Sequence, residues 1–173
     1  MKIFRTFIYV VLVLGFASFG LGQVMISEVD PATGTIELHN AGEEAVDVSG
    51  MFFCNRPAYT PLSALELVSG ELNIPAGGYA VVKWDAVAKA DAELGLYSTP
   101  SYSSADAILS YISWGSAGHG REGVAVEAGL WTAGAFLDVP AEGQTLSHVA
   151  MGEDMVANWA AAEPSLGEAN MME

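Results

Sequence analysis

Short apolar runs separated by turn residues make up most of the chain after its N-terminal segment. VMISEV at 24–29 ends at 30–34, a cluster of turn residues that contains aspartate, proline and glycine. In TIELHN at 35–40, apolar and polar residues alternate, which is the period of a half-buried strand. Together with AVDVSGMFFC at 45–54, these runs predict three consecutive strands of an antiparallel sheet.

Later segments extend the same pattern. The expected strands are YAVVKW at 79–84, AILSYISW at 107–114, VAVEAGLW at 124–131 and QTLSHVA at 144–150, whereas the pattern of LSALELVSG at 62–70 leaves its type open. Seven or more short strands with turns about 8–12 residues apart favour a single all-β domain built as an antiparallel β-sandwich.

One segment departs from the strand pattern. In DAVAKADAELGLY at 85–97, Asp85 can cap a short helix, the alanines are good helix formers and Gly95 can end it. We therefore expect a short helical insertion near 85–95. A further turn of helix is possible at 155–161.

The first 22 residues have the layout of a secretory signal. Lys2 and Arg5 precede the apolar run 7–16, and small residues follow up to Gly22. An uncleaved membrane anchor is the alternative, but the apolar run is shorter than the ~20 residues of a spanning helix. Cleavage after Gly22 predicts an exported domain at 23–173 with no membrane span.

The charge of the domain limits which partners it can bind, and its cysteine content limits how it can be stabilised. Residues 23–173 hold 4 basic residues against all 21 acidic ones, a net charge of −17. Such a surface repels phosphate backbones, so no nucleic acid partner is expected. Cys54 is the only cysteine, so no intrachain disulfide can form, and its apolar neighbours predict that it is buried.

Four segments, taken in order, resemble the successive signatures of the lamin tail domain family. They are MISEVDPATGTIELHNAG at 25–42, VDVSGMFF at 46–53, IPAGGYAVV at 74–82 and ANWAAAEPSLGEAN at 157–170. The resemblance implies an immunoglobulin-like sandwich and, in exported bacterial proteins, a binding or architectural unit without catalytic residues. It also implies that Glu37 projects from a strand, that Asn40 and Gly42 lie in a turn, and that Gly77 and Gly78 permit positive φ.

The stretch SWGSAGHGRE at 113–122 combines more residues that could serve in catalysis or binding than any other stretch of the chain. It lacks the lysine of a phosphate-binding P-loop, and its glycines have the wrong spacing for a dinucleotide site. We interpret it as a glycine-rich connection between two strands, in which Arg121 can pair with an acid. A ligand or partner contact stays a second hypothesis, with the binding residues Trp114, His119, Arg121 and Glu122.

No motif predicts catalysis, a cofactor or a metal. His39, His119 and His148 show no metal-ligand spacing, and no G-x-S-x-G elbow presents a serine. A histidine site assembled only in space is still open. The leading expectation is a non-catalytic exported module that binds a protein or envelope partner. The alternatives are a hydrolase that uses the His119 loop and a calcium-dependent adhesion module that uses the acidic turns.

Overall fold

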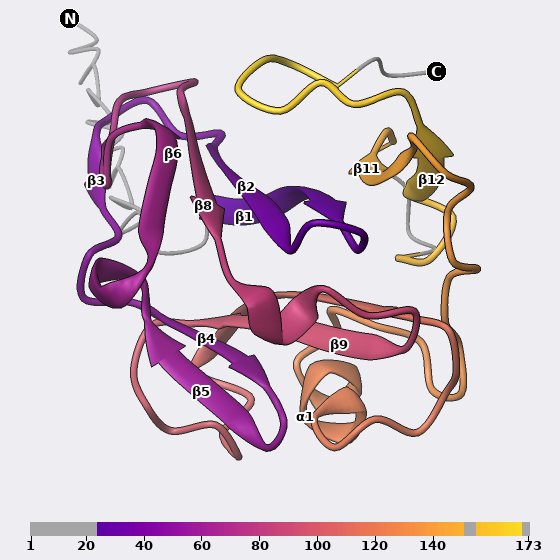
Figure 1. The fold of residues 1–173 in the computed structure, drawn as a ribbon. Helices are drawn as coiled ribbons and strands as arrows, with labels where there is room; N and C mark the ends of the chain where they lie inside the picture. The colour runs from indigo at the N-terminus through magenta and orange to yellow at the C-terminus, as the bar shows by residue number, and fades with distance from the viewer. Residues whose placement is uncertain (1–23, 151–154, 171–173) are drawn as a thin grey trace, which may run out of the picture.

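The computed structural model describes residues 24–150 and 155–170, so the expected signal segment and its cleavage site lie outside the described residues. Within them the chain forms a six-stranded, a four-stranded and a two-stranded sheet, and all the strand pairings in these sheets are antiparallel. The two larger sheets lie one above the other (Figure 1). The all-β antiparallel sandwich with a short helical element is therefore confirmed.

The upper layer in Figure 1 is the six-stranded sheet, in the order β12-β11-β1-β2-β8-β6. Its strands are β1 (Val24–Asp30), β2 (Thr35–Asn40), β6 (Glu66–Gly70), β8 (Tyr79–Lys83), β11 (Thr145–His148) and β12 (Trp159–Ala162). The central strands β1 and β2 are joined by the predicted turn at 30–34. A register shift between Ile26 and Glu28 interrupts their pairing.

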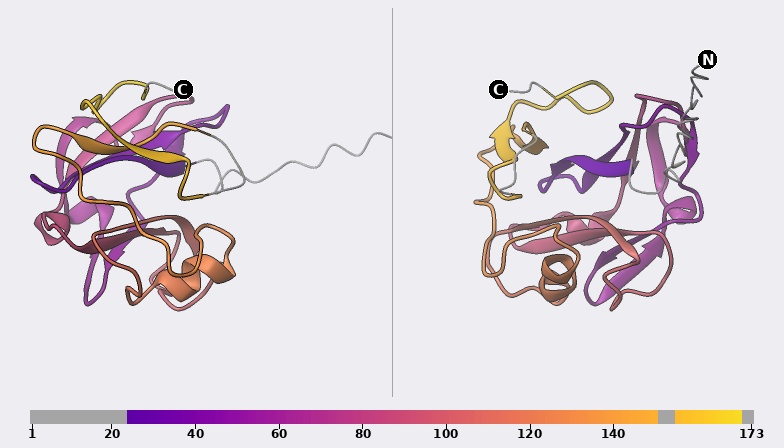
Figure 2. Two further views of the ribbon diagram at one scale, coloured as in Figure 1. Left: turned by 90° about the vertical axis from the view of Figure 1, so that its right-hand side faces the viewer. Right: turned by 180° about the vertical axis from the view of Figure 1, so that it is seen from behind.

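The lower layer is the four-stranded sheet, in the order β10-β9-β4-β5. Its strands are β4 (Phe52–Asn55), β5 (Ala58–Pro61), β9 (Ala92–Tyr97) and β10 (Ile108–Trp114), and the small sheet pairs β3 (Val46–Asp47) with β7 (Asn73–Ile74). The views in Figure 2 show the two layers from the side and from behind.

The core fills the space between the two layers. Ile26 and Leu38 come from the upper sheet and Phe53 and Ile112 from the lower one, and all four side chains are fully buried. Burying one such side chain is worth about 1.5–3 kcal/mol, so packing can stabilise the sandwich without a disulfide. The single thiol, Cys54, is buried as expected.

The predicted helix near 85–95 is present only as a single turn. A 3₁₀ turn, η3 (Asp85–Val87), begins at the expected residue, but Ala92–Tyr97 forms strand β9 instead of continuing a helix. This strand lies between β4 and β10 and is buried on both faces, so its sequence does not alternate. The alanine and glutamate in it therefore resembled a helical pattern.

The prediction of a strand at 124–131 is wrong. Residues Glu122–Glu127 form helix α1, which contacts β10. In Figure 1 this helix lies below the lower layer, on the side away from the six-stranded sheet. The N–H groups of Val124 and Ala125 both bond the carbonyl of Arg121, and Ala125 is the buried residue. The alternating valines suggested a strand, but packing against the sheet favours the helix.

Two ambiguous segments are also resolved. The stretch 62–70 divides into a 3₁₀ turn, η2 (Leu62–Ala64), and the edge strand β6. The possible helical turn at 155–161 is a hydrogen-bonded turn over residues 155–158, and β12 follows it. No helix among residues 24–150 and 155–170 is long and apolar enough to cross a bilayer.

Candidate functional site

Two of the four predicted binding residues have structural roles. Trp114 is fully buried, and its indole Nε1 donates to the carbonyl of Lys89 at 2.8 Å. The carboxylate of Glu122 accepts the N–H groups of Gly118 at 2.6 Å and Gly134 at 2.8 Å. Glu122 therefore joins the glycine-rich loop to the turn that follows α1, and neither residue is placed to bind a ligand.

His119 contacts an acid in the segment that precedes β9. Its Nε2 lies 3.3 Å from Oδ1 of Asp91, and Ser116 Oγ donates to that same oxygen at 2.8 Å. In a serine hydrolase the imidazole lies between the serine and the carboxylate, because it must take the serine proton. Here the carboxylate lies between the other two groups. This arrangement supplies Ser116 with no general base.

Arg121 takes part in a surface cluster formed over β5. Its Nη2 donates to the hydroxyl of Tyr59 at 2.9 Å, and its Nη1 donates to Ser103 Oγ at 3.2 Å. The guanidinium carbon is 5.8 Å from the centre of the Tyr59 ring, and the ring of Tyr102 lies 4.3 Å from that ring. Arg56 packs so closely against Gly120 that a Cβ there would collide with it.

We call Arg56, Tyr59, Tyr102, Ser103 and Arg121 the arginine–tyrosine surface. The ion pairs among the described residues are Lys83–Asp85 and His119–Asp91, so neither arginine is paired with a described carboxylate. Both guanidinium groups therefore keep their charge available at the surface.

Buried polar groups support this surface from below. Oε2 of Glu93, a residue only 1% exposed, accepts the N–H of Arg121 at 2.8 Å and the hydroxyl of Tyr111 at 3.0 Å. Burial raises the pKa of the nearby Cys54 thiol to about 11, although the Arg121 guanidinium opposes the shift. Because the thiol is protonated near neutral pH, Cys54 is not an activated nucleophile.

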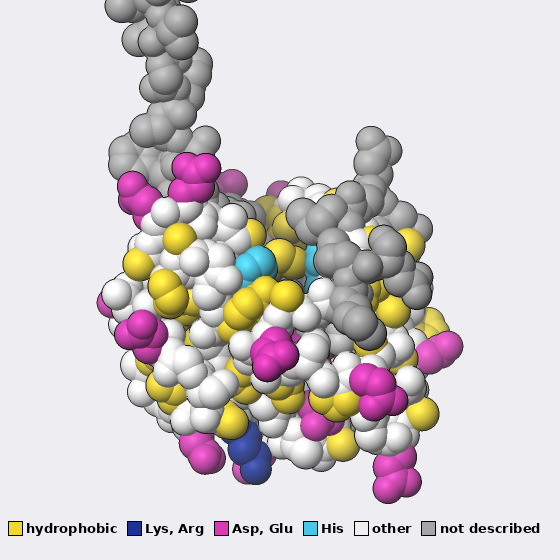
Figure 3. Space-filling model, turned by 90° about the horizontal axis from the view of Figure 1, so that it is seen from above, with side chains coloured by type: hydrophobic (Ala, Val, Ile, Leu, Met, Phe, Trp, Pro, Cys, Tyr) yellow, Lys and Arg dark blue, Asp and Glu magenta, His cyan; other side chains and the backbone are white. Residues whose placement is uncertain are grey.

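A second feature lies on the outer face of the upper sheet. A groove of about 290 Å³ is lined by Met25, Ser27, His39, Ala41, Tyr79, His148, Ala169 and Asn170. In Figure 3 two histidine side chains lie on this face with hydrophobic side chains between them. We call this feature the histidine groove. Sequence spacing did not reveal it, since its residues come from four separate strands and from the C-terminal end.

Aromatic contacts orient both imidazoles of the histidine groove. The ring of His39 stacks on Tyr79 at 4.5 Å with an interplanar angle of 12°, and His148 meets Trp159 edge-on at 5.2 Å. Burial lowers the pKa of both histidines, and the nearby His39 lowers that of His148 further. The lowered pKa favours the uncharged form of both rings near neutral pH.

Beside the groove, two carboxylates are buried beneath the end of the chain. Residues 163–170, which we call the C-terminal strap, cross the outer face of β1 and β2. Glu28 accepts hydrogen bonds from Thr145 and Ser165, and Glu37 accepts them from Ser27 and Gly167. Both acids have 0% exposure. The expected projection of Glu37 from its strand is correct, but the strap covers it.

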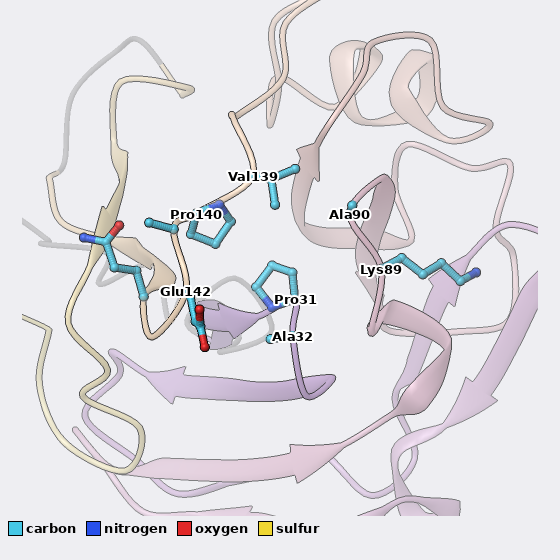
Figure 4. A pocket seen from close by; sticks show the side chains of 9 residues that line it. Pro31, Ala32, Lys89, Ala90, Val139, Pro140 and Glu142 are labelled. Atoms are coloured by element: carbon cyan, nitrogen blue, oxygen red, sulfur yellow. The ribbon is translucent and has the colours of Figure 1, made fainter.

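A smaller pocket of about 210 Å³ lies between the β1–β2 turn, the segment before β9 and residues 139–144. Figure 4 shows Pro31, Val139 and Pro140 around it, whereas the side chain of Lys89 points away. Because few polar groups converge on this pocket, it supports no specific ligand.

Among the described residues, no group of three or more His, Cys, Asp or Glu side chains could hold a metal ion. Comparisons of the chain with family models, curated proteins and solved structures found no match.

Proposed function

We propose that the chain is an exported, non-catalytic β-sandwich module that binds a protein partner through the arginine–tyrosine surface. The observation that carries the proposal is a pair of arginines without a described carboxylate partner, next to Tyr59, whose side chain is 41% exposed. The lamin-tail-like order of the four sequence segments and the signal-like residues 1–22 support the same class of protein.

The composition of the surface fits a protein interface. Arginine and tyrosine are enriched among the residues that dominate binding energy, because they combine a large contact area with polar groups. Neutral hydroxyls hold the Arg121 guanidinium in place and do not neutralise its charge. The arrangement is thus prepared for an acidic group on a partner.

The negative charge of the rest of the molecule also favours binding at the two arginines. The domain carries a net charge of −17, and Arg56 and Arg121 are two of its four basic residues. An acidic segment of a partner is repelled by most of the surface and attracted where the two arginines lie. Such electrostatic complementarity affects orientation and specificity more than raw affinity.

A binding experiment with matched variants tests the proposal. Residues 23–173 are immobilised, and binding of proteins from the envelope fraction of the source cells is compared with binding to Arg56→Ala, Tyr59→Ala and Lys89→Ala. We expect a partner to bind the wild type and Lys89→Ala, and to bind the first two variants at least tenfold more weakly. Lys89→Ala removes the same charge elsewhere.

Equal losses in all three variants would show that net charge alone is responsible, which contradicts a local surface. Catalytic turnover of ester, phosphate or glycoside substrates that His119→Ala abolishes would instead support the hydrolase alternative. A partner that binds every variant equally would place the interface on another face.

A further inference from the structure

Two acidic side chains lie side by side beneath the C-terminal strap. Glu28 of β1 and Glu37 of β2 are directly opposite each other in the antiparallel register, and both have 0% exposure. Each is bound by a different residue of the strap. Ser165 Oγ donates to Glu28 at 2.8 Å, and the N–H of Gly167 donates to Glu37 at 2.6 Å. The strap therefore closes over two groups that repel each other when both are ionised.

The strap also reaches other strands of the upper sheet, above which it lies in Figure 1. Asn170 donates to the carbonyl of Ser27 in β1 at 2.7 Å, and a Cβ at Gly167 would lie 3.5 Å from Ser69 Oγ of β6. The described hydrogen bonds that join the strap to the sheet each use a side chain. The strap can thus leave the sheet without breaking the pairing of any two strands. Since Ala169 and Asn170 line the histidine groove, its departure removes one wall of that groove.

Ionisation of Glu37 opposes closure of the strap. Burial raises the pKa of Glu37 to about 7, and the charge of Glu28 adds to the rise, whereas the bonds from Ser27 and Gly167 oppose it. When the strap is open, water reaches the carboxyl group and its pKa returns toward the ordinary 4.5. Because the open state then releases the proton more readily, opening becomes more favourable as the pH rises from 4.5 to 7. Above pH 7 both states are ionised, so this effect is constant.

The other titratable groups nearby do not give the same dependence on pH. The described ones around Glu37 are Glu28, His39, Tyr79 and His148, and the strap carries the exposed acids Glu163 and Glu168. Burial raises the pKa of Tyr79, so the phenol stays uncharged in this range. Burial lowers the pKa of both histidines. An imidazole that gains a proton on opening favours the open state at low pH, which is the opposite direction.

We propose that the C-terminal strap is a pH-controlled latch, which is closed while Glu37 is protonated and opens locally when Glu37 is ionised beside Glu28. The sandwich beneath the strap stays folded as the latch opens. Access to the two carboxylates and to the histidine groove thereby depends on pH. The latch goes beyond the proposed binding function and is independent of it, because the arginine–tyrosine surface is built over β5 of the other sheet.

Native-state amide exchange of residues 23–173 between pH 4.5 and 8 tests the latch. The N–H of Gly167 reports opening because it bonds Glu37 directly, and its protection factor removes the pH dependence of exchange in an unprotected chain. The reference is Glu37→Gln, which keeps an acceptor oxygen but cannot ionise. Relative to this variant, the protection of Gly167 in the wild type should fall about tenfold per pH unit up to about pH 7 and then level off.

Low concentrations of urea separate local opening from global unfolding. Local opening exposes little surface, so urea should not change the protection of Gly167. Leu38 of β2 is fully buried and exchanges only when the sheet unfolds, so urea should lower its protection.

Two further variants identify the group that titrates. Ser27→Ala removes a hydrogen bond that lowers the pKa of Glu37, so the protection of Gly167 should go on falling to a higher pH than in the wild type. Glu71→Gln alters an exposed acid and should follow the wild type throughout. Circular dichroism shows whether each variant is folded. If Glu37→Gln does not fold, comparison of Ser27→Ala with the wild type carries the test.

Three results would overturn the proposal. In the first, the protection of Gly167 has the same pH profile in the wild type and in Glu37→Gln. In the second, urea lowers the protection of Gly167 and Leu38 alike, so that the strap opens only when the whole sheet unfolds. In the third, Ser27→Ala levels off at the same pH as the wild type, which means that a group other than Glu37 controls the strap.

Discussion

At the scale of the residue, Glu37 illustrates how burial changes the chemistry of a carboxyl group. The strap covers it completely, and its oxygens accept hydrogen bonds from Ser27 and Gly167, each at 2.6 Å. Removal from water raises its pKa to about 7, and the charge of the neighbouring Glu28 contributes to the rise. The two hydrogen bonds act in the opposite direction but are outweighed.

This pKa predicts that stability falls as the pH rises. The folded protein holds the Glu37 proton up to about pH 7, whereas the unfolded chain releases it near 4.5. The stabilisation is complete below pH 4.5 and is lost as the pH rises through 7. At about 1.36 kcal/mol per pH unit, the loss is about 3 kcal/mol. Urea unfolding at pH 4.5 and pH 8 should show that Glu37→Gln lacks this component.

A matched substitution at an exposed acid provides the control. Glu71→Gln removes a carboxylate that is exposed to solvent, so it should keep the pH dependence of the wild type. If Glu37→Gln and the wild type lose the same free energy of unfolding between the two pH values, burial of Glu37 is not the cause.

The residues of the candidate surfaces show what sequence could and could not identify. Arg121 stood out because a simple turn does not require it, but its partner Tyr59 lies on a strand whose position was unknown. His39 and Met25 face each other only because β1 and β2 pair in one register. Alternation predicts which face of a strand a side chain occupies, and it does not predict which strand lies beside it.

At the scale of the element, the turn between β1 and β2 depends on a glycine. Gly34 has a φ of +75°, and a Cβ there would lie 2.7 Å from the carbonyl oxygen of Trp84. The same residue links the turn to the chain after β8, since its carbonyl accepts the N–H of Trp84 at 2.8 Å. Both the backbone conformation and the close contact exclude a side chain.

We therefore expect Gly34→Ala to lower the free energy of unfolding by about 1–3 kcal/mol, the usual cost of a strained backbone. Gly50→Ala is the control, because a Cβ at Gly50 meets nothing within 4 Å and should change stability by less than about 0.5 kcal/mol. Thermal unfolding of the three proteins measures the difference. An equal Tm for the two variants would contradict the role of Gly34.

The errors of prediction also occurred at this scale, and they have a shared cause. Strands with one solvated face, such as β2, alternate and were identified from sequence. Strand β9 is buried on both faces, and α1 is a short helix with two valines. The hydrophobic pattern of neither sequence therefore shows the periodicity of the structure that it forms. Short elements are decided by what they pack against, which local sequence does not contain.

At the scale of the whole molecule, the strap connects residues 163–170 to β1, the first described strand. Asn170 Nδ2 donates to the carbonyls of Ser27 in β1, at 2.7 Å, and His148 in β11, at 3.2 Å. Ser165 and Gly167 also bond the buried carboxylates, so hydrogen bonds that involve side chains fix the strap, and not a strand ladder.

Loss of the Asn170 amide should release the strap. Asn170→Ala removes the two hydrogen bonds to the sheet carbonyls and the one that Oδ1 accepts from Ser165, so we expect a loss of about 1–3 kcal/mol in the free energy of unfolding. Amide exchange at Gly167 should also become faster. Glu168→Ala alters an exposed residue of the same strap and should change neither quantity. Unchanged protection of Gly167 in Asn170→Ala would show that the carboxylates alone hold the strap.

The strap also has a consequence for the order of events during synthesis. Strands β1 and β2 leave the ribosome early, but Thr145 and Ser165, which donate to Glu28, and Gly167, which donates to Glu37, lie beyond residue 144. At about 5–20 residues per second, these two strands wait on the order of ten seconds for them. Throughout this interval Glu28 and Glu37 lack these hydrogen bonds. The hydrogen bonds that hold the strap can thus form only after residues 163–170 have been made.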